Sequence, residues 1–525
     1  MITLLDYGAG NVRSVVNALE YIGEKVKIVN SPDDILSAEK LVFPGVGSFG
    51  NMIKILNEKN YVDPLRDYLN ENKQFLGICL GLHALFEKSE ESNEIYEGLG
   101  FIKGSVTKFN VDHSVPQIGW NGVNIKKKSG FFSNFRGQEK FYFVHSYHVN
   151  PIDDKDVLTT TNYGYEYTSS IEKGNVIATQ FHPEKSGENG LKLLKNFVEQ
   201  KESNIPEIST DKTRIAKRII ACLDVRSNDN GDLVVTKGDQ YDVREEGDVR
   251  NLGKPVELAE RYYKEGSDEI TFLNITGFRD FPLEDMPMID VLKKTSANVF
   301  VPLTIGGGIR DFTDKNGKKY TALEVASEYF RSGADKISIG SDAVLIVEEY
   351  LKTGIKTGKS SIEVISKVYG NQAVVISVDP KRVYVKEKNE TAHVVIKTDQ
   401  KGPSGEEYCW YQCTIKGGRE GRELDAITFS KACEELGAGE ILLNCIDKDG
   451  TNSGFDCELI SAVRNVVTIP VIASSGAGSV EHFAEVFEKT DAEAALAAGI
   501  FHRREVPVEA VKDHLKDKVE IRTKS

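Results

Sequence analysis

The sequence predicts an α/β protein in which an N-terminal α/β domain is followed by a (β/α)8 barrel. First, residues 1 to about 200 alternate short apolar strands, such as "ITLLDYGAGN" and "QFLGICLG", with helical stretches. Second, eight apolar strand candidates separated by helical segments follow from about Arg214, and eight is the strand number of such a barrel. Third, similar strand ends recur about half a barrel apart within this second region, which indicates two duplicated half-barrels.

Similar segments that occur in the same order in both halves of the barrel region support this repeat. Asp224 ends the first barrel strand and Asp379 ends the fifth. "GSDEITFLNIT" resembles "GAGEILLNCID", and "LTIGGGIR" resembles "IASSGAGSV". Coincidence between short apolar strands is the alternative explanation, and the preserved order disfavours it.

A polar segment marks the expected domain boundary. The segment "ESNIPEISTDKT" contains a proline and has no hydrophobic periodicity, so we interpret it as a linker. The expected domains are therefore residues 1–202, a linker at 203–213 and the barrel at 214–525. The second region is long for a barrel, and alternating patterns at about 381–422 indicate an insertion made of hairpins.

The composition excludes several functional classes. The chain of 525 residues is 40% hydrophobic and 28% charged, as in soluble globular proteins, and its formal net charge of -14 disfavours a nucleic-acid partner. No apolar run reaches membrane-spanning length, and the N-terminus lacks the basic region of a signal peptide. The seven cysteines form no CxxC pair, which favours free thiols in a reducing, cytoplasmic compartment. No cluster of His and Cys indicates a metal or a cofactor.

"GICLG" places Cys79 between two glycines at a strand-to-helix turn. This pattern is typical of a nucleophile elbow, where a helix N-terminus would favour the thiolate. A buried structural cysteine is the alternative. The motif "QFHPEKSG" favours the nucleophile, because His182 could act as its base and Glu184 could orient that histidine. The turn "PGVGSFG" offers backbone amides for an oxyanion.

These motifs, with "DYGAGN", "PQIGWN" and "FVHSYHV", resemble class I glutamine amidotransferases, and in particular the glutaminase of the imidazole glycerol phosphate synthase family. The resemblance covers residues 1–200 and implies that Cys79 attacks the glutamine amide, with His182 as base and acid and Glu184 orienting it. The residues that match the oxyanion strand or glutamine-binding positions are Gly45, Val46, Gly47, His83, Glu91, Ser146 and Tyr147.

His83 departs from the family pattern, which usually has glutamine at this place. It lies one helical turn after Cys79 and could donate a hydrogen bond, but its charge is expected to vary with pH. A tolerated substitution is the favoured interpretation over a new function.

In the barrel, Asp224 and Asp379 form a pair of carboxylates at strand ends, where the active sites of such barrels lie. Strands one and five are on opposite sides, so the two side chains can face each other and move protons on both sides of a substrate. The alternative is that each aspartate only caps a loop. Glycine-rich turns at "GGGIR" and "SSGAGS", completed by "IGSDA" and "AAGIF", predict two equivalent phosphate sites and a substrate with two terminal phosphates.

This region resembles the cyclase of the same family through "AKRIIACLDV", "PLTIGGGIR", "GADKISIGSDAV" and "ILLNCIDKDGT". The resemblance makes Asp224 and Asp379 the acid–base pair. A sister isomerase shares the half-barrel plan, which leaves some ambiguity. The residues expected at the substrate and phosphate sites are Lys237, Gly307, Gly308, Gly340, Ser341, Asp447, Gly450, Thr451, Ser475, Gly476, Gly478, Ala498 and Gly499.

Four charged residues near strand starts lie at the barrel end opposite the two aspartates: Arg218, Glu269, Lys336 and Glu440. Two acids and two bases in one layer can pair into a ring. In the related cyclase such a ring gates the passage of ammonia, and structural bracing is the other interpretation.

The resemblance implies a bifunctional enzyme of histidine biosynthesis. It would release ammonia from glutamine, pass it through the barrel, and convert phosphoribulosyl formimino-aminoimidazole carboxamide ribotide into imidazole glycerol phosphate and aminoimidazole carboxamide ribotide. The expected partners are small-molecule substrates only, and a monomer is expected. The alternatives are a sugar-phosphate isomerase with a structural amidotransferase domain, and a non-catalytic nucleotide-sensing scaffold.

Overall fold

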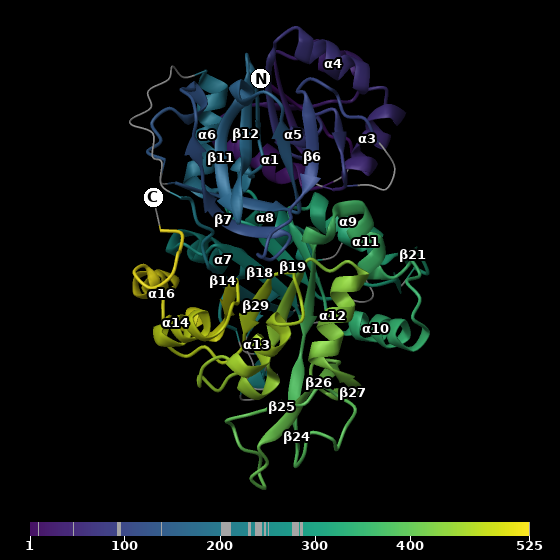
Figure 1. The fold of residues 1–525 in the computed structure, drawn as a ribbon, viewed down its shortest axis with the longest axis vertical. Helices are drawn as coiled ribbons and strands as arrows, with labels where there is room; N and C mark the ends of the chain where they lie inside the picture. Colours follow the sequence, from purple (N-terminus) through teal and green to yellow (C-terminus); the bar gives the residue numbers. More distant parts are fainter. Residues whose placement is uncertain are drawn as a thin grey trace.

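The computed structural model describes residues 1–8, 10–45, 47–91, 96–137, 139–200, 212–228, 233–236, 244–245, 248–249, 251–275, 283, 287–314 and 316–523. Two α/β domains lie one above the other in Figure 1, the N-terminal domain in purple and blue at the top and the C-terminal domain in green and yellow below. A small sheet extends from the C-terminal domain at the end far from the N-terminal domain.

The N-terminal domain is built on a mixed sheet of 11 strands, in the order β2-β1-β3-β4-β13-β12-β10-β6-β5, with β11 paired to β12 and β8 paired to β11. The strands from β2 to β13 in this order run parallel, and β12 pairs antiparallel to β13. The strands are β1 (Ile2–Leu4), β2 (Val26–Ile28), β3 (Lys40–Gly45), β4 (Gln74–Cys79), β5 (Lys88–Ser89), β6 (Gly104–Lys108), β8 (Asn124–Ile125), β10 (Tyr147–Pro151), β11 (Val157–Tyr163), β12 (Tyr165–Lys173) and β13 (Val176–Thr179).

Helices and a second, two-stranded sheet complete this domain. The helix α6 buries Leu193, Leu194 and Phe197 on one face, as its amphipathic pattern predicts. The sheet pairs β7 with β9 in antiparallel fashion. The elements are α1 (Val12–Tyr21), α2 (Pro32–Leu36), α3 (Phe49–Glu58), α4 (Val62–Asn70), α5 (Leu80–His83), α6 (Gly187–Glu199), β7 (Gln117–Gly122) and β9 (Lys140–His145).

The C-terminal domain is a closed barrel of eight parallel strands, as the sequence predicts. The strands follow one another in the order β14, β18, β19, β22, β23, β28, β29, β30, and β30 pairs with β14 to close the barrel. The antiparallel β15 (Leu233–Thr236) is added to β14. The strands are β14 (Arg218–Ser227), β18 (Glu269–Asn274), β19 (Leu303–Gly306), β22 (Lys336–Ile339), β23 (Val374–Val378), β28 (Glu440–Asn444), β29 (Val471–Ser474) and β30 (Ala494–Ala497).

Helices connect the strands and cover the outside of the barrel (Figure 1). Capping boxes begin two of them, at Thr321 with Glu324 and at Ser360 with Glu363, which explains where these helices start. The helices are α7 (Pro255–Glu265), α8 (Pro287–Thr295), α9 (Ala322–Arg331), α10 (Ser341–Thr353), α11 (Ser361–Tyr369), α12 (Ala426–Leu436), α13 (Cys457–Arg464), α14 (Val480–Lys489), α15 (Gly499–His502) and α16 (Val508–Leu515).

The segment expected to hold hairpins is an antiparallel sheet that follows β23. It consists of β24 (Pro380–Val385), β25 (Ile396–Lys397), β26 (Tyr408–Ile415) and β27 (Glu420–Asp425). A buried network fastens it to the barrel, because Arg382 Nη2 lies 2.6 Å from Asp456 Oδ2 and the Tyr411 hydroxyl donates to Asp456 Oδ1 at 2.9 Å. Asp456 also caps α13, so the sheet is tied to the segment that follows β28.

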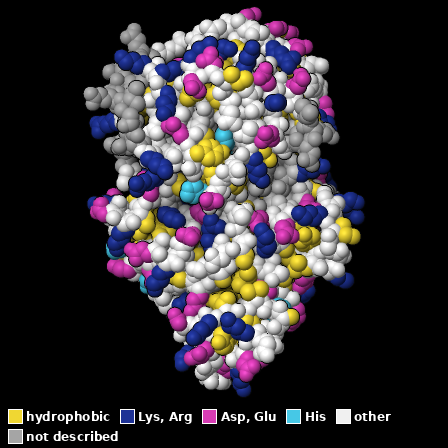
Figure 2. Space-filling model, viewed as in Figure 1, with side chains coloured by type: hydrophobic (Ala, Val, Ile, Leu, Met, Phe, Trp, Pro, Cys, Tyr) yellow, Lys and Arg dark blue, Asp and Glu magenta, His cyan; other side chains and the backbone are white. Residues whose placement is uncertain are grey.

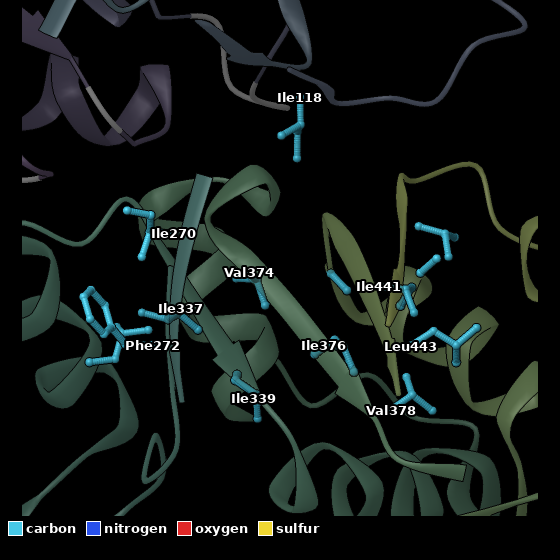
Figure 3. Close-up of a cluster of buried hydrophobic side chains, with 14 of the residues drawn as sticks. Ile118, Ile270, Phe272, Ile337, Ile339, Val374, Ile376, Val378, Ile441 and Leu443 are labelled. Carbon is cyan, nitrogen blue, oxygen red and sulfur yellow. The ribbon is translucent and has the colours of Figure 1, made fainter. Parts of the chain in front are cut away.

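Side chains of the N-terminal domain join the main hydrophobic cluster of the barrel. Ile118, Trp120 and Tyr142 of the N-terminal domain belong to the same cluster of buried side chains as the barrel strands. Figure 3 shows Ile118 extending from its own domain toward the starts of barrel strands that carry Ile270, Val374 and Ile441. Burial of large apolar side chains stabilises a protein by about 1.5–3 kcal/mol each, so this contact is a substantial part of the junction.

The chain enters the barrel along the N-terminal domain. The Asn162 backbone N–H donates to Thr213 Oγ1 at 2.7 Å, and the Ala216 N–H donates to the Trp120 carbonyl at 2.7 Å. The face of the molecule in Figure 2 shows acidic and basic side chains interspersed over both domains. Within the described ranges, no helix combines the length and the apolar character needed to cross a membrane.

Candidate functional sites

Cys79 ends β4 in a strained conformation at a sharp turn. Its φ of 52° and ψ of -101° lie outside the ordinary regions for a residue with a side chain, and α5 begins at the next residue. Glycine is required on both sides, since a Cβ on Gly81 would lie 2.1 Å from the Phe43 carbonyl oxygen and one on Gly77 would lie 2.8 Å from the Gly81 oxygen. This is the geometry of a nucleophile elbow, with backbone strain concentrated at one reactive side chain.

His182 and Glu184 lie beside Cys79 on the segment that follows β13. His182 Nδ1 is 2.8 Å from Glu184 Oε1, and both side chains are buried. His182 has extended backbone angles, and the short 3-10 helix Pro183–Lys185 places Glu184 beside the ring. The His182 N–H donates to the Tyr142 carbonyl at 2.9 Å, which anchors the segment to β9.

Electrostatics favour a charged histidine in this arrangement. Burial alone would lower the pKa of His182, but the Glu184 carboxylate and the Cys79 sulfur outweigh burial and raise that pKa well above its usual value. A hydrogen bond between His182 and Cys79 acts in the same direction. His182 can therefore hold a proton beside the Cys79 sulfur.

His83 is tied to the same site through Gln180, a residue that sequence reasoning missed. His83 Nε2 is 2.9 Å from Gln180 Oε1, and Gln180 Nε2 lies 3.6 Å from Cys79 Sγ. Burial lowers the pKa of His83 to about 4. A change in its charge with pH is therefore expected below the neutral range, because burial favours the uncharged imidazole. The position of Gln180 two residues before His182 is the only signal in the sequence.

The cavity around Cys79 is small and is formed by both domains. Its volume is about 50 Å³, and its lining includes the expected residues Gly45, Gly47, His83, Glu91, Ser146 and Tyr147. The barrel contributes Phe330, Ala334, Asp335, Gln372 and Ala373. Val46 lies outside the described residues. Burial raises the pKa of Glu91 to about 7, against a hydrogen bond from the Phe49 N–H to its carboxylate at 2.9 Å.

The barrel end nearest this cavity carries the four charged residues expected to pair. Arg218 Nη1 lies 2.9 Å from Glu269 Oε2, and Arg218 also pairs with Glu440. Lys336 Nζ lies 2.7 Å from Glu269 and 2.6 Å from Glu440. All four side chains are fully buried, and they form a closed ring of alternating charge. Burial opposes ionisation of Glu440, but Arg218 and Lys336 lower its pKa overall.

Tyr142 lies between the cavity and the ring. It lines the cavity of Cys79, and the charges of Glu269 and Arg218 act on its hydroxyl group. Burial and Glu269 raise the pKa of Tyr142 well above its usual value. Its hydroxyl has no hydrogen-bond partner within the described part of the chain. Sequence reasoning missed this residue, because it resembles the other aromatic residues of an apolar strand.

The other end of the barrel holds the two predicted aspartates. Asp224 lies within β14, which continues to Ser227 because β15 pairs with it beyond the aspartate. Asp379 directly follows β23. Burial raises the pKa of Asp379, and nearby Asp449 and Asp224 add to the effect, while Asn444 Nδ2 donates to its carboxylate at 2.9 Å. Asn444 was not among the predicted residues, because only the closed barrel places it beside Asp379.

A cavity of about 500 Å³ opens at this end. Asp224, Gly450, Ser475, Gly476, Ala498 and Gly499 line it, as expected, whereas Asp379 and Thr451 are not among its lining residues. Asp447 does not line it either, because its carboxylate accepts the Arg382 N–H of the inserted sheet at 2.7 Å. Gly478 is not among the lining residues, and a Cβ on it would lie 2.5 Å from Asn452, which lines the cavity. Lys237 lies outside the described residues.

The other glycine-rich turn lies at the ends of β19 and β22. Gly307 and Gly308 have φ values of 95° and 77°, which side chains rarely adopt. Gly340 caps α10, and the Ser341 hydroxyl accepts the Lys416 N–H at 3.1 Å. The inserted sheet therefore reaches this turn as well as Asp447.

The fold and these sites define a two-domain enzyme, in which a class I glutamine amidotransferase with a Cys-His-Glu constellation is joined to a duplicated (β/α)8 barrel. The family described as "Glutamine amidotransferase class-I" matches residues 3–201, and "Histidine biosynthesis protein" matches residues 218–507. The chain is 59% identical over 531 residues to "Imidazole glycerol phosphate synthase hisHF, chloroplastic" of Arabidopsis thaliana, covering 99% of this chain and 89% of the relative.

Two further relatives support the same assignment. The chain is 54% identical over 532 residues to "Imidazole glycerol phosphate synthase hisHF" of Schizosaccharomyces pombe, covering 98% of both proteins. It is 42% identical over 305 residues to "Imidazole glycerol phosphate synthase subunit HisF" of Methanosphaera stadtmanae, covering 58% of this chain and 97% of that subunit. The chain belongs to the imidazole glycerol phosphate synthase hisHF family, and the predicted family, fold class and bifunctional organisation are confirmed.

Proposed function

We propose that the chain hydrolyses glutamine at Cys79, conducts the ammonia through the barrel, and uses it to convert phosphoribulosyl formimino-aminoimidazole carboxamide ribotide into imidazole glycerol phosphate and aminoimidazole carboxamide ribotide. The observation that carries the proposal is the enclosure of Cys79 by residues of both domains, at the barrel end that holds the buried ring. Ammonia released there would otherwise meet water and be protonated.

In the first reaction, the Cys79 thiolate adds to the side-chain carbonyl carbon of glutamine. Backbone amides of the Gly45–Gly47 strand would stabilise the oxyanion. The His182 imidazolium then gives its proton to the leaving nitrogen, and ammonia departs from the thioester. Water, activated by the neutral His182, releases glutamate and restores the thiol. Glu184 holds the His182 ring in position throughout.

Glu91, Ser146, Tyr147 and His83 would bind the glutamine, since they line the same cavity. A carboxylate at Glu91 suits the ammonium group of the substrate, and the neutral His83 fixes Gln180 beside Cys79.

The ring of Arg218, Glu269, Lys336 and Glu440 would gate the passage of ammonia into the barrel. Its closed pairing braces the barrel, and a transient break between two partners would open a path from the cavity of Cys79. Gate and brace are therefore two properties of the same four side chains.

At the barrel mouth, ammonia would attack the ketone carbon of the two-phosphate substrate. Asp379, whose pKa is raised, is suited to donate a proton, and Asp224 is suited to accept one. Proton transfers between these two residues would carry the reaction through imine formation, cleavage of the C–N bond and closure of the imidazole ring. Lys237, Asp447, Gly450 and Thr451 would lie around the substrate, and the glycine-rich turns would bind its phosphates.

The organisation of the chain follows from this proposal. Residues 1–202 would form the glutaminase, 203–213 the linker and 214–525 the cyclase with its insertion. Both activities lie on one chain, so a monomer acting on small molecules is proposed. All seven cysteines are free thiols, which supports a reducing compartment such as the cytoplasm.

The test is an assay of the purified chain with glutamine and the two-phosphate substrate, in which glutamate and imidazole glycerol phosphate are both measured. Cys79→Ala should abolish turnover with glutamine and retain turnover with added ammonia. Asp224→Asn should abolish both. Equal loss of both reactions in Cys79→Ala would contradict the passage of ammonia, and full cyclisation by Asp224→Asn would contradict the acid–base assignment. An isomerase with a structural amidotransferase domain would form no glutamate.

A further inference from the structure

Arg503 follows α15 at the rim of the large cavity at the barrel mouth. This cavity is lined by the carboxylates of Asp224, Asp449 and Glu505. Arg503 is the one lysine or arginine among the described residues that line it. A doubly charged phosphate that enters the cavity therefore meets three carboxylates, and Arg503 is the side chain placed to offset them.

Glu505 orients the guanidinium group of Arg503. Nε lies 2.8 Å from Glu505 Oε1, and Nη2 lies 3.0 Å from Glu505 Oε2, so these two nitrogens form a two-point pair with one carboxylate. The third nitrogen, Nη1, lies over Gly499, where a Cβ would come within 2.8 Å of it. Glycine at position 499 thus leaves space for the guanidinium group at the wall of the cavity.

The turn after β29, the strand that pairs with β30, offers backbone donors beside Arg503. Ser475 and Gly476 line the same cavity with φ values of 71° and 95°, which turn the chain sharply after β29. The N–H groups of Gly476 and Ala477 donate to no acceptor within the described part of the chain. An anion between this turn and Nη1 would receive backbone hydrogen bonds on one side and a charge-assisted bond on the other.

We infer that Arg503 binds one terminal phosphate of the substrate in this cavity, and that Glu505 holds its guanidinium group in the binding orientation. The inference rests on the proposed function, because that function supplies a substrate with two phosphates. It adds a side-chain determinant to a site that the sequence predicted from glycine-rich turns alone. Because Arg503 would contact the phosphate at one end of the substrate, it contributes to the preference for substrates that are phosphorylated at that end.

The test compares Arg503→Met with Arg504→Met in the full-length chain. Arg504 is the neighbouring arginine, is exposed and does not line the cavity, so it is a matched control for charge and position. The KM for the two-phosphate substrate is measured with ammonia as the nitrogen source. Arg503→Met should raise KM about tenfold or more, the size expected for loss of a charge-assisted hydrogen bond, and Arg504→Met should leave KM unchanged. Arg503→Lys should give an intermediate value.

Calorimetric titration with the two products separates the phosphate sites and needs no turnover. Each product carries one phosphate, so Arg503→Met should weaken the binding of one product about tenfold and spare the other. Equal KM values for the Arg503 and Arg504 variants would overturn the inference, as would equal weakening of both products. If the native chain binds a product through Arg503 but does not cyclise the substrate, the proposed function fails while this inference stands. If the native chain cyclises and Arg503→Met is unaffected, this inference alone fails.

Discussion

The buried Lys185 and the partly buried Asp335 form an ion pair across the domain junction, with Nζ of Lys185 2.7 Å from Oδ2 of Asp335. Lys185 directly follows Glu184, and Asp335 directly precedes Lys336 of the ring. Asn11 Nδ2 also donates to Asp335 at 2.8 Å. The pair thus joins the Cys-His-Glu constellation to the charged ring of the barrel through adjacent residues on each side.

Breaking this pair should uncouple the two sites. In Asp335→Asn the buried Lys185 ammonium loses its carboxylate, and an unpaired buried charge costs about 3–5 kcal/mol. We expect a lower free energy of unfolding and a weaker response of glutamine hydrolysis to the barrel substrate. Urea denaturation and glutamate release, each with and without that substrate, measure the two effects.

Lys195→Met is the control for this experiment. Lys195 pairs with Glu199 on the surface at 3.7 Å and is mostly exposed, so its loss should change stability by less than about 1 kcal/mol. If Asp335→Asn and Lys195→Met change stability and the response to the barrel substrate equally, the ion pair of Asp335 does not couple the two sites.

His83→Gln should preserve the first reaction. Glutamine can keep a hydrogen bond to Gln180, and the pKa of His83, lowered to about 4 by burial, means that no charge is removed at neutral pH. The kcat for glutamine hydrolysis should stay within a few-fold, with the same dependence on pH between 5 and 8, whereas His83→Ala should lower it further. Loss of an ionisation from the pH profile in His83→Gln would contradict this prediction.

Glutamine binding should weaken as pH falls through about 7. The pKa of Glu91 is raised to about 7 by burial, so its carboxyl group gains a proton below that pH and no longer attracts the ammonium group of glutamine. KM for glutamine measured from pH 5.5 to 8.5 should rise on the acid side. Glu91→Gln should show a high KM at every pH; if it keeps the acid-side rise, another group is responsible.

Removing one cation from the ring should both destabilise the barrel and release ammonia to solvent. Lys336→Met leaves Glu269 and Glu440 buried with Arg218 alone, at a cost of about 3–5 kcal/mol. Glutamate formed should then exceed imidazole glycerol phosphate formed. The surface variant Lys431→Met, which affects an exposed pair with Glu434, should keep the two products equal. Equal amounts of glutamate and imidazole glycerol phosphate from Lys336→Met would indicate that the ring only braces the barrel.

Asn444 should lower the pKa of Asp379, the proposed acid at the barrel mouth. Its hydrogen bond lowers the pKa of Asp379, against the larger effect of burial. Asn444→Leu should therefore raise that pKa and move the corresponding limb of the cyclisation profile to higher pH. Ser377→Ala should give a smaller shift in the same direction, because its hydrogen bond is the weaker one. A shift to lower pH in either variant would contradict the assignment.

The sequence predicted the barrel and both sets of catalytic candidates because each rests on a local pattern. Glycines around Cys79, the i and i+2 spacing of His182 and Glu184, and strand-end aspartates are all visible within short segments. The partners of these residues were missed for a physical reason. Gln180, Tyr142 and Asn444 act through contacts that exist only when distant strands are paired. A lowered pKa at His83 likewise depends on burial, which spacing alone does not show.

The presence of both domains on one chain has a further consequence for how the molecule tolerates change. Thr213 and Ala216 are held against the first domain as the chain enters the barrel, so the junction is an intramolecular contact. A tether of this kind sets an effective concentration of order millimolar, which dilution does not alter. Substitutions that weaken the junction would separate two independent subunits, but here they leave both sites in the same molecule. The one-to-one ratio of the two sites is therefore kept when the sequence of the junction changes.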